Sequence, residues 1–278
     1  MKKLVGIIGH PIEHSISPAM HNAAFKKLGL EFEYVPFDVK PEDLSEAING
    51  FRALHVAGFN VTVPHKENVM QYLNRTTKLA ETIGAVNTVK NQDGELIGYN
   101  TDGPGFIESL MQDAGFDPKG KNVLVIGAGG ASRAVALSLA EGHAKTIYIS
   151  DVAAGKADAL AKYIDSFENV SCKAIELSQG IFDQIDLLVN ATPIGMHPMI
   201  DASPIPEGIK LPKELMVYDL VYTPSETKIL KAAKKAGCKT CTGLGMLVRQ
   251  GALAFTLFTG EEAPIETMQQ SAKAALRL

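Results

Sequence analysis

The stretch VLVIGAGGA, residues 123–131, joins an apolar strand-like run to a helix through a glycine-rich turn. The run ends at Gly127-Ala128-Gly129-Gly130, and the helix-like ASRAVALSLAEG follows directly. Glycine permits a tight turn and a close approach of backbone to a pyrophosphate, whose charge then meets the N–H groups at the helix start. The third position of the fingerprint is Ser132 rather than glycine, so the motif alone is weak. The strand-turn-helix order predicts a dinucleotide-binding unit; the alternative is a turn that only packs a helix close to a strand.

An acid follows the next strand-like run of this unit. Asp151 comes directly after TIYIS, roughly 20 residues beyond the glycines, which is the spacing at which a carboxylate receives the ribose 2′-OH of NAD. A carboxylate there repels the 2′-phosphate of NADP, so we expect NAD to be preferred. Two alternatives stay open: Asp151 only caps a helix that begins near Ala153, or Lys156 reaches back to a phosphate.

Strand-like and helix-like runs alternate on both sides of this stretch, a pattern typical of α/β layers. Asp93-Gly94 predicts a β-hairpin within AVNTVKNQDGELIGYN, because this dipeptide supplies a positive-φ turn. Breakers at Gly103-Pro104-Gly105 predict a boundary between two units. The predicted strands are LVGIIG, EFEYVPF and GFNVTV before that boundary, and NVLVIG, TIYIS, DLLVNA and LMVYDLV after it.

Helical spacing marks several stretches between these strands. Pro18 and Pro41 suit first-turn positions, and Gly29 can end the first helix. The second unit is predicted to run to about Gly243. After it, LGMLVRQGALAFTLFTG is a strongly apolar helix whose aliphatic face we expect in the core.

Composition excludes several classes of protein. With 278 residues, two moderate domains are a natural expectation. A net charge of -4 provides no basic face for nucleic acid. Three cysteines fit a reducing compartment, so we expect a cytoplasmic protein. The apolar start ends too soon for a signal peptide, and no run reaches membrane-spanning length. No metal is expected, because Cys238 and Cys241 form a single CxxC and the spacing of His10, His14 and His21 matches no familiar ligand set.

Several polar side chains have no apparent structural role. Ser15 and Ser17 flank one apolar residue, so in an extended segment their hydroxyls point the same way and could bind a carboxylate; the alternative is that Ser17 is a helix N-cap. Asn60 and Thr62 share one face of the strand GFNVTV. Lys66 lies at or beyond the carboxyl end of that strand, where open α/β sheets place their ligands.

Asn87 and Asp102 add two polar groups at strands or strand ends. With them, the ordered motifs HSISPAMHN, NVTVPHK, GAVNT, NTDG, GAGGAS, NATPIGM, DLVYTP and GLGMLVRQ resemble those of the shikimate dehydrogenase family over nearly the whole chain. One stretch departs from the family: many members have an Asn-Arg-Thr run that favours NADP where this chain has Ser150 and Asp151. The departure supports the preference for NAD over NADP.

The resemblance implies a role for each matching residue. It makes Lys66 and Asp102 the catalytic pair. It implies substrate binding by Ser15, Ser17, Asn60, Thr62, Asn87, Asp102, Tyr222 and Gln250. It implies cofactor binding by Gly127, Ala128, Gly129, Gly130, Ala131, Asp151, Thr192, Leu220, Gly243 and Met246.

The resemblance also implies the architecture and the reaction. We expect an α/β fold with an N-terminal α/β substrate domain, residues 1–103 plus 244–278, and a Rossmann-like dinucleotide-binding domain, residues 104–243, with the active site in the cleft between them. The expected reaction is reversible hydride transfer between shikimate and NAD or NADP, in aromatic amino acid biosynthesis. Alternatives are a quinate/shikimate dehydrogenase of quinate catabolism and a non-catalytic dinucleotide sensor. The expected partner is a small molecule, without nucleic acid or membrane, in a monomer or homodimer.

Overall fold

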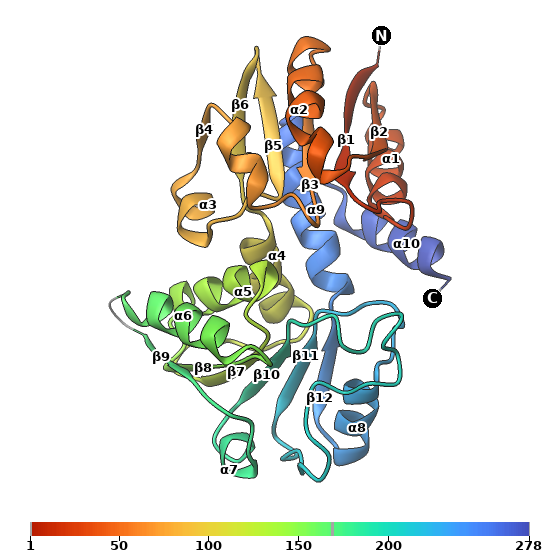
Figure 1. The fold of residues 1–278 in the computed structure, drawn as a ribbon. Coiled ribbons are helices and arrows are strands. Elements are labelled where there is room, and N and C mark those ends of the chain that lie inside the picture. Colours follow the sequence, from red (N-terminus) through yellow and green to blue (C-terminus); the bar gives the residue numbers. More distant parts are fainter. Residues whose placement is uncertain (1, 168–169, 278) are drawn as a thin grey trace. The chain divides into compact units, whose positions relative to one another are not determined.

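The computed structural model describes residues 2–167 and 170–277. The chain forms two compact units: unit 1 comprises Met1–Gly105 and Val248–Leu278, and unit 2 comprises Phe106–Leu247. Within the described residues each unit contains one six-stranded sheet with helices packed on it (Figure 1). The predicted α/β class is therefore confirmed. The division between the units falls inside two helices, α4 (Asp102–Gln112) and α9 (Leu244–Thr259).

Unit 2 has an entirely parallel sheet in the order β12-β11-β10-β7-β8-β9. Its central strands are short runs of aliphatic residues buried on both faces, as expected where helices cover a parallel sheet. The chain moves outward in one direction from β7 and in the other from β10, which is the doubly wound arrangement. The strands are β7 (Asn122–Ile126), β8 (Thr146–Ser150), β9 (Ser171–Ala174), β10 (Leu187–Asn190), β11 (Met216–Asp219) and β12 (Lys239–Thr242).

The helices of unit 2 connect these strands. Helices α5 and α6 pack on β7 and β8, and α8 packs on β11 and β12 (Figure 1). Their bounds are α5 (Gly130–Glu141), α6 (Ala154–Asp165), α7 (Gln179–Phe182) and α8 (Lys228–Ala236). Because α5 starts directly after β7, its N-terminus lies beside the point where the strand order reverses.

Unit 1 has a mixed sheet in the order β2-β1-β3-β5-β6-β4. Strand β1 is parallel to β2 and β3, whereas β5 is antiparallel to β3 and β6. The predicted hairpin is confirmed: Asp93 and Gly94 have φ values of 53° and 93° between β5 and β6. The strands are β1 (Lys3–Gly9), β2 (Phe32–Asp38), β3 (Gly58–Val61), β4 (Arg75–Thr76), β5 (Thr88–Gln92) and β6 (Glu95–Tyr99).

Helices from both ends of the sequence pack together in unit 1. Helix α10 lies along α1 (Figure 1), and Ser271 donates a 2.9 Å hydrogen bond to the carbonyl of Ala19. Pro18 lies in the first turn of α1, and Gly29 ends this helix with φ 64°, as predicted. The helical elements are α1 (Ser17–Leu28), the 3-10 turn η1 (Pro41–Asp43), α2 (Leu44–Ala53), the 3-10 turn η2 (Asn68–Tyr72), α3 (Lys78–Ile83) and α10 (Ile265–Leu276).

The two units divide after Gly105, within the stretch where the sequence predicted a boundary. Gly103-Pro104-Gly105 does not interrupt a helix, however, because α4 begins at Asp102 and runs through all three residues. A proline is tolerated in a first helical turn, where its missing N–H has no partner to lose. Gly105 has a packing role instead: a Cβ added there would lie 2.6 Å from the backbone nitrogen of Gln250. The glycine therefore permits close approach between α4 and α9 within unit 1.

Two of the three histidines considered as metal ligands have contacts within unit 1. His10 Nδ1 lies 2.9 Å from the Asp38 carboxylate. His21 is buried and stacks on the Tyr34 ring, with 4.3 Å between centroids. Among residues 2–167 and 170–277, no group of three or more His, Cys, Asp or Glu side chains could hold a metal ion. In the same described ranges, no helix is long and apolar enough to cross a membrane.

Candidate active site

An ion pair between Lys66 and Asp102 is the centre of the candidate site in unit 1. Lys66 Nζ donates to Asp102 Oδ2 over 2.6 Å, and the side chains are 24% and 11% exposed. Lys66 follows β3, and its carbonyl accepts a hydrogen bond from the Val86 backbone. Asp102 is the first residue of α4, where the helix dipole stabilises a negative charge. Lys66 was predicted to lie at or beyond the carboxyl end of this strand. It follows β3 in the structure, and the fold places it against Asp102.

Asn87 links this ion pair to α9. Its Nδ2 has two protons and three acceptors in range: Thr101 Oγ1 at 2.9 Å, Asp102 Oδ1 at 2.9 Å and Gln250 Oε1 at 3.3 Å. Its Oδ1 accepts from the Thr101 backbone N–H over 2.7 Å. Asn87, Asp102 and Gln250, which the resemblance grouped, therefore lie together, and Thr101 joins them.

Asn60 lies deeper beside this group and is almost completely buried. Its Oδ1 accepts from Tyr34 over 2.7 Å, and its Nδ2 donates to the Asn87 carbonyl and to Thr88 Oγ1. Thr62 lies just after β3 and is half-buried. Tyr34 and Thr88 were not singled out from the sequence, because each sits in a strand-like run where a core position is the ordinary expectation.

The structure corrects two expectations about Ser15 and Ser17. The segment is not extended, because Ile16 between them has φ -91° and ψ -2°. Ser17 is not an N-cap either, since α1 begins at Ser17 and Ile16 occupies the cap position without a side-chain hydrogen bond. Ser15 Oγ instead accepts a 3.4 Å hydrogen bond from the Ser17 backbone. The two hydroxyls still come from either side of Ile16 at the N-terminus of α1, where an anion is favoured.

The glycine-rich turn of unit 2 has the geometry that a bound pyrophosphate requires. Gly127 has φ 112°, and a Cβ there would lie 2.9 Å from the Ala191 carbonyl oxygen. At Gly129 and Gly130 an added Cβ would meet nothing within 4 Å, so the space above the turn is open. Gly130 starts α5, and the N–H groups of a first helical turn have no partner within the helix. Ser132, which replaces the third glycine, is buried against this turn.

Asp151 binds the turn from the end of β8. Its Oδ2 accepts from the Ala128 N–H over 2.7 Å, and its Oδ1 accepts from the Ala153 N–H over 2.8 Å. The alternative that Asp151 is a helix cap does not hold strictly, because α6 begins at Ala154 and its N-cap is Ala153. Asp151 nevertheless has a local structural role, since it accepts from the N–H of that cap residue. Each carboxylate oxygen retains a second acceptor site, so these contacts leave room for a ribose hydroxyl. They also occupy the N–H of Ala128, one of the residues expected at the pyrophosphate.

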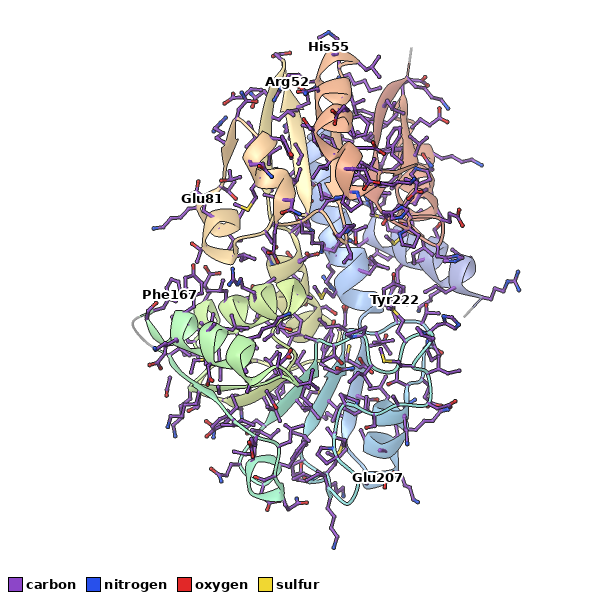
Figure 2. All side chains as sticks on the ribbon, viewed as in Figure 1. Arg52, His55, Glu81, Phe167, Glu207 and Tyr222 are labelled. Atoms are coloured by element: carbon purple, nitrogen blue, oxygen red, sulfur yellow. The ribbon has the colours of Figure 1, made fainter. Side chains whose placement is uncertain are left out.

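The remaining expected residues of unit 2 follow the ends of β10, β11 and β12. Thr192 donates from its N–H and hydroxyl to Asn190 Oδ1, over 3.1 and 2.6 Å. Leu220 donates from its N–H to the Asn190 carbonyl. Gly243 lies against Leu220, Met246 is in the first turn of α9, and Tyr222 lies on the segment after β11 (Figure 2).

A buried polar group that sequence reasoning missed holds two of these strand ends together. Asn190 Nδ2 donates to Asp219 Oδ1 over 2.9 Å, and Thr227 donates to Asp219 Oδ2 over 2.5 Å. Burial raises the pKa of the Asp219 carboxyl, and hydrogen bonds from Thr227, Val221 and Asn190 oppose that rise. The signal was present in the sequence, since Asn190 and Asp219 are polar residues near the carboxyl ends of the predicted strands DLLVNA and LMVYDLV.

Comparison with known proteins identifies the family. Residues 7–89 match the shikimate dehydrogenase substrate binding domain, residues 109–227 the shikimate / quinate 5-dehydrogenase family, and residues 243–273 the shikimate 5'-dehydrogenase C-terminal domain. A shikimate dehydrogenase (NADP(+)) of Methanopyrus kandleri is 47% identical, with 99% of this chain and 96% of the relative covered. The protein of the same name from Methanocaldococcus jannaschii is 49% identical, with 97% and 95% covered.

Solved structures agree with these relatives. A shikimate dehydrogenase in complex with NADP+ has a TM-score of 0.92 at 48% identity, covering 99% of this chain and 96% of that one. The Listeria monocytogenes enzyme in complex with shikimate and NAD has a TM-score of 0.89 at 38% identity, covering 97% and 96%. A quinate dehydrogenase from Corynebacterium glutamicum in complex with NAD has a TM-score of 0.88 at 33% identity, covering 97% and 98%. With its motifs, its two sheets and its full-length relatives in agreement, the chain belongs to the shikimate dehydrogenase family.

Proposed function

We propose that the protein is a shikimate dehydrogenase, which transfers a hydride reversibly between shikimate and a nicotinamide dinucleotide and forms 3-dehydroshikimate. The observation that carries this proposal is the partly buried Lys66–Asp102 pair, bound through Asn87 to Gln250. These residues provide an acid/base pair beside amide groups that suit a polyol. The corresponding cellular role is in the biosynthesis of aromatic amino acids.

The two units are assigned separate tasks in this proposal. Unit 1 binds the substrate, because it contains the Lys66–Asp102 pair and the amide groups. Unit 2 binds the dinucleotide, because its sheet is doubly wound and its glycine-rich turn opens onto the N-terminus of α5. The pyrophosphate would be held by the backbone of Gly129, Gly130 and Ala131, with Gly127 making the turn. Thr192, Leu220, Gly243 and Met246 are assigned to the nicotinamide end.

Substrate recognition follows from the chemistry of the side chains. Ser15 and Ser17 bind the carboxylate of shikimate from the N-terminus of α1. Thr62, Asn87, Asp102 and Gln250 bind the ring hydroxyls, and the family resemblance adds Asn60 and Tyr222 to the substrate-binding residues. Each buried hydroxyl of the substrate then has a partner, and an analogue without that hydroxyl would leave the partner unpaired. Asn60 contributes at most an acceptor, because both protons of its Nδ2 are already donated within the protein.

The chemical step divides between cofactor and protein. The nicotinamide ring supplies a hydride acceptor or donor when it is bound. During oxidation the carbinol carbon loses a hydride and its hydroxyl loses a proton, which Lys66 in its neutral form takes up, so that the step ends with the Lys66 ammonium paired to the Asp102 carboxylate. During reduction the same pair returns the proton to the ketone oxygen. Asn87 holds Asp102 in place by donating to its Oδ1, so the proton is exchanged at a fixed position.

The preference between NAD and NADP rests on opposing observations. The relatives from Methanopyrus kandleri and Methanocaldococcus jannaschii are named for NADP(+). Asp151 favours NAD, because a carboxylate with two free acceptor sites binds a ribose diol and repels a phosphate. We therefore propose a preference for NAD over NADP that depends on Asp151 alone. The names of the relatives do not support this preference. Measuring kcat/KM for both dinucleotides at saturating shikimate settles the order, and a higher value with NADP would reject the role given to Asp151.

The function itself is tested by following reduced dinucleotide at 340 nm with purified protein. The protein is expected to form NADH or NADPH with shikimate, at a higher kcat/KM than with quinate. A reversed ratio would assign the protein to quinate oxidation, the activity named for the Corynebacterium glutamicum structure. If neither acid gives reduced dinucleotide although the protein binds the dinucleotide, a non-catalytic sensor would replace the proposed enzyme.

A further inference from the structure

A chain of buried side-chain hydrogen bonds connects β2 to the Lys66–Asp102 pair within unit 1. It begins at Tyr34, whose hydroxyl donates to Asn60 and is also hydrogen-bonded to Ser17. It passes from Asn60 to Thr88. It then reaches Thr101 and Asn87, and through Asn87 it reaches Asp102. Tyr34 and Thr88 are therefore connected to the proposed acid/base pair although neither contacts it.

The orientation of the Asn60 amide is fixed by its surroundings. One proton of Nδ2 faces the Asn87 carbonyl oxygen at 3.1 Å. A flipped amide would place Oδ1 against this oxygen, so two acceptors would face each other. Oδ1 must consequently face Tyr34, whose hydroxyl must donate. Burial keeps this hydroxyl protonated, since it raises the pKa of Tyr34 well above its usual value.

Thr88 transmits this orientation to Asn87. It is fully buried in β5, and its Oγ1 accepts from Asn60 Nδ2 over 2.9 Å. Its single proton then has two acceptors, Asn87 Oδ1 and Thr101 Oγ1, each at 3.2 Å. Both choices leave Asn87 Oδ1 as an acceptor. The Thr101 backbone N–H donates to the same oxygen over 2.7 Å. Together, Thr88 and this N–H direct Asn87 Nδ2 at Asp102, the partner of Lys66.

We propose that Tyr34 and Thr88 are positioning residues of the reaction, which fix the amides of Asn60 and Asn87 and so hold Asp102 and Lys66 in their productive geometry. This inference rests on the proposed function. Neither hydroxyl touches the reacting atoms in this scheme; each acts through an amide. Loss of either hydroxyl leaves a buried polar group without a hydrogen-bond partner. The amide side chains of Asn60 and Asn87 can then rotate to find another partner.

The main test compares Thr88→Val, Thr88→Ser and wild type in shikimate oxidation. Thr88→Val keeps the shape of the side chain but removes the hydroxyl, so kcat is expected to fall about 10-fold to 100-fold, as for displaced catalytic groups. KM for the dinucleotide should stay unchanged, because unit 2 is untouched. Thr88→Ser retains the hydroxyl and should recover most of kcat.

Thr77→Val is the matched control in unit 1. It removes a threonine hydroxyl that caps α3 by accepting from the Ala80 N–H, so it should lower the Tm with kcat unchanged. A Thr88→Val enzyme that keeps its kcat, or loses no more than Thr77→Val, would overturn the proposal. So would a Thr88→Ser enzyme as slow as Thr88→Val, because the hydroxyl would then be irrelevant.

A second pair of variants covers the case in which Thr88→Val does not fold. Tyr34→Phe removes the donor to Asn60 and is expected to lower kcat roughly 3-fold to 10-fold, less than Thr88→Val because it lies one residue farther from Asn87. Since both hydroxyls act through Asn60, the double variant should lose less than the product of the single losses. Wild-type kcat in Tyr34→Phe, or strictly multiplicative losses, would contradict the scheme. Wild-type activity is measured first, so a failed function is distinguished from a failed inference.

Discussion

Lys66, together with Asp102, is the residue that we propose to exchange a proton with the substrate. It is held by Asp102 at 2.6 Å and is only 24% exposed. We predict that Lys66→Ala lowers kcat by roughly 10²–10⁴-fold, the range for a positioned acid/base group. Dinucleotide binding should be retained, because the glycine-rich turn belongs to unit 2. Steady-state kinetics with a fluorescence titration of reduced dinucleotide measures both.

Lys78→Ala is the control for the loss of a positive charge from unit 1. Lys78 is exposed at the first position of α3, and its replacement should leave kcat within about 2-fold, as expected for a surface side chain away from the site. Full activity in Lys66→Ala would remove the lysine from the mechanism.

His21 gives the protein a pH-dependent stability. It is completely buried, and burial lowers its pKa to about 3. The unfolded chain binds a proton here below its ordinary pKa of about 6.5, whereas the folded chain does not. The free energy of unfolding is therefore not reduced by this residue above pH 6.5. As the pH falls from 6.5 towards 3, it decreases by about 1.4 kcal/mol per pH unit.

We predict that His21→Phe weakens this dependence, since phenylalanine can stack on Tyr34 without titrating. Urea unfolding at pH 7.5 and 5.5 should show a loss in the free energy of unfolding that is about 1–1.5 kcal/mol smaller in the variant. Equal losses in both proteins would assign the acid sensitivity to other groups.

At the scale of elements, Gly243 packs the end of β12 closely against the segment after β11. A Cβ added at Gly243 would lie 1.9 Å from the Leu220 carbonyl oxygen, which is backbone and cannot rotate away. We predict that Gly243→Ala costs about 2–4 kcal/mol in the free energy of unfolding, as an overpacked buried site does. Thermal unfolding measures this as a lower Tm.

Gly180→Ala is the corresponding control in unit 2. Gly180 lies in α7, and an added Cβ there would meet nothing within 4 Å. Alanine also has the higher helix propensity, so Tm should be unchanged or slightly raised. If Gly243→Ala unfolded at the wild-type temperature, the close approach to Leu220 would not limit this position.

The strands that the sequence did not predict share one position, the edge of a sheet. Strands β9 and β12 are the two edges of the unit 2 sheet, and β4 is an edge of the unit 1 sheet. Their residues are SCKA, KTCT and RT, with mixed burial. These three edge strands are short and lack the apolar run that marks a strand buried on both faces, so composition could not reveal them. The longer edge strand β2 was predicted, because FEYVPFD contains more apolar and aromatic residues. The central strands, VLVI in β7 above all, were predicted for the opposite reason.

The same limit applies to the candidate site. Lys66, Asn87 and Asp102 lie in motifs that sequence alone could single out. Tyr34 and Thr88 could not be recognised in the same way, because their importance depends on strands β2, β3 and β5 aligning their side chains. The local conformation at Ser15 and Ser17 was misjudged because an X-Ser-X-Ser-Pro segment does not by itself distinguish extended from helical backbone at Ile16.

At the scale of the whole molecule, the proposed function assigns substrate chemistry to one unit and cofactor binding to the other. The sequence places the Lys66–Asp102 pair in unit 1 and the glycine-rich turn in unit 2. A ligand that binds one folded unit stabilises that unit against opening, by about 2.7 kcal/mol at 100 times its Kd. Amide exchange that requires opening of the unit then slows by up to about 100-fold. Each ligand should thus leave a separate exchange signature.

We predict that shikimate alone slows hydrogen exchange in segments of unit 1 around Ser17, Lys66 and Gln250, and that the dinucleotide alone slows it in unit 2 around Gly130. Peptide-level deuterium uptake followed by mass spectrometry, with each ligand separately and with neither, makes the comparison. A carboxylic acid without ring hydroxyls, at the same concentration as shikimate, is the control for non-specific effects of an added acid. Hydrogen exchange slows in the unit that a ligand binds. If the dinucleotide slowed exchange only in unit 1, or shikimate only in unit 2, the assignment of substrate to unit 1 and dinucleotide to unit 2 would be reversed.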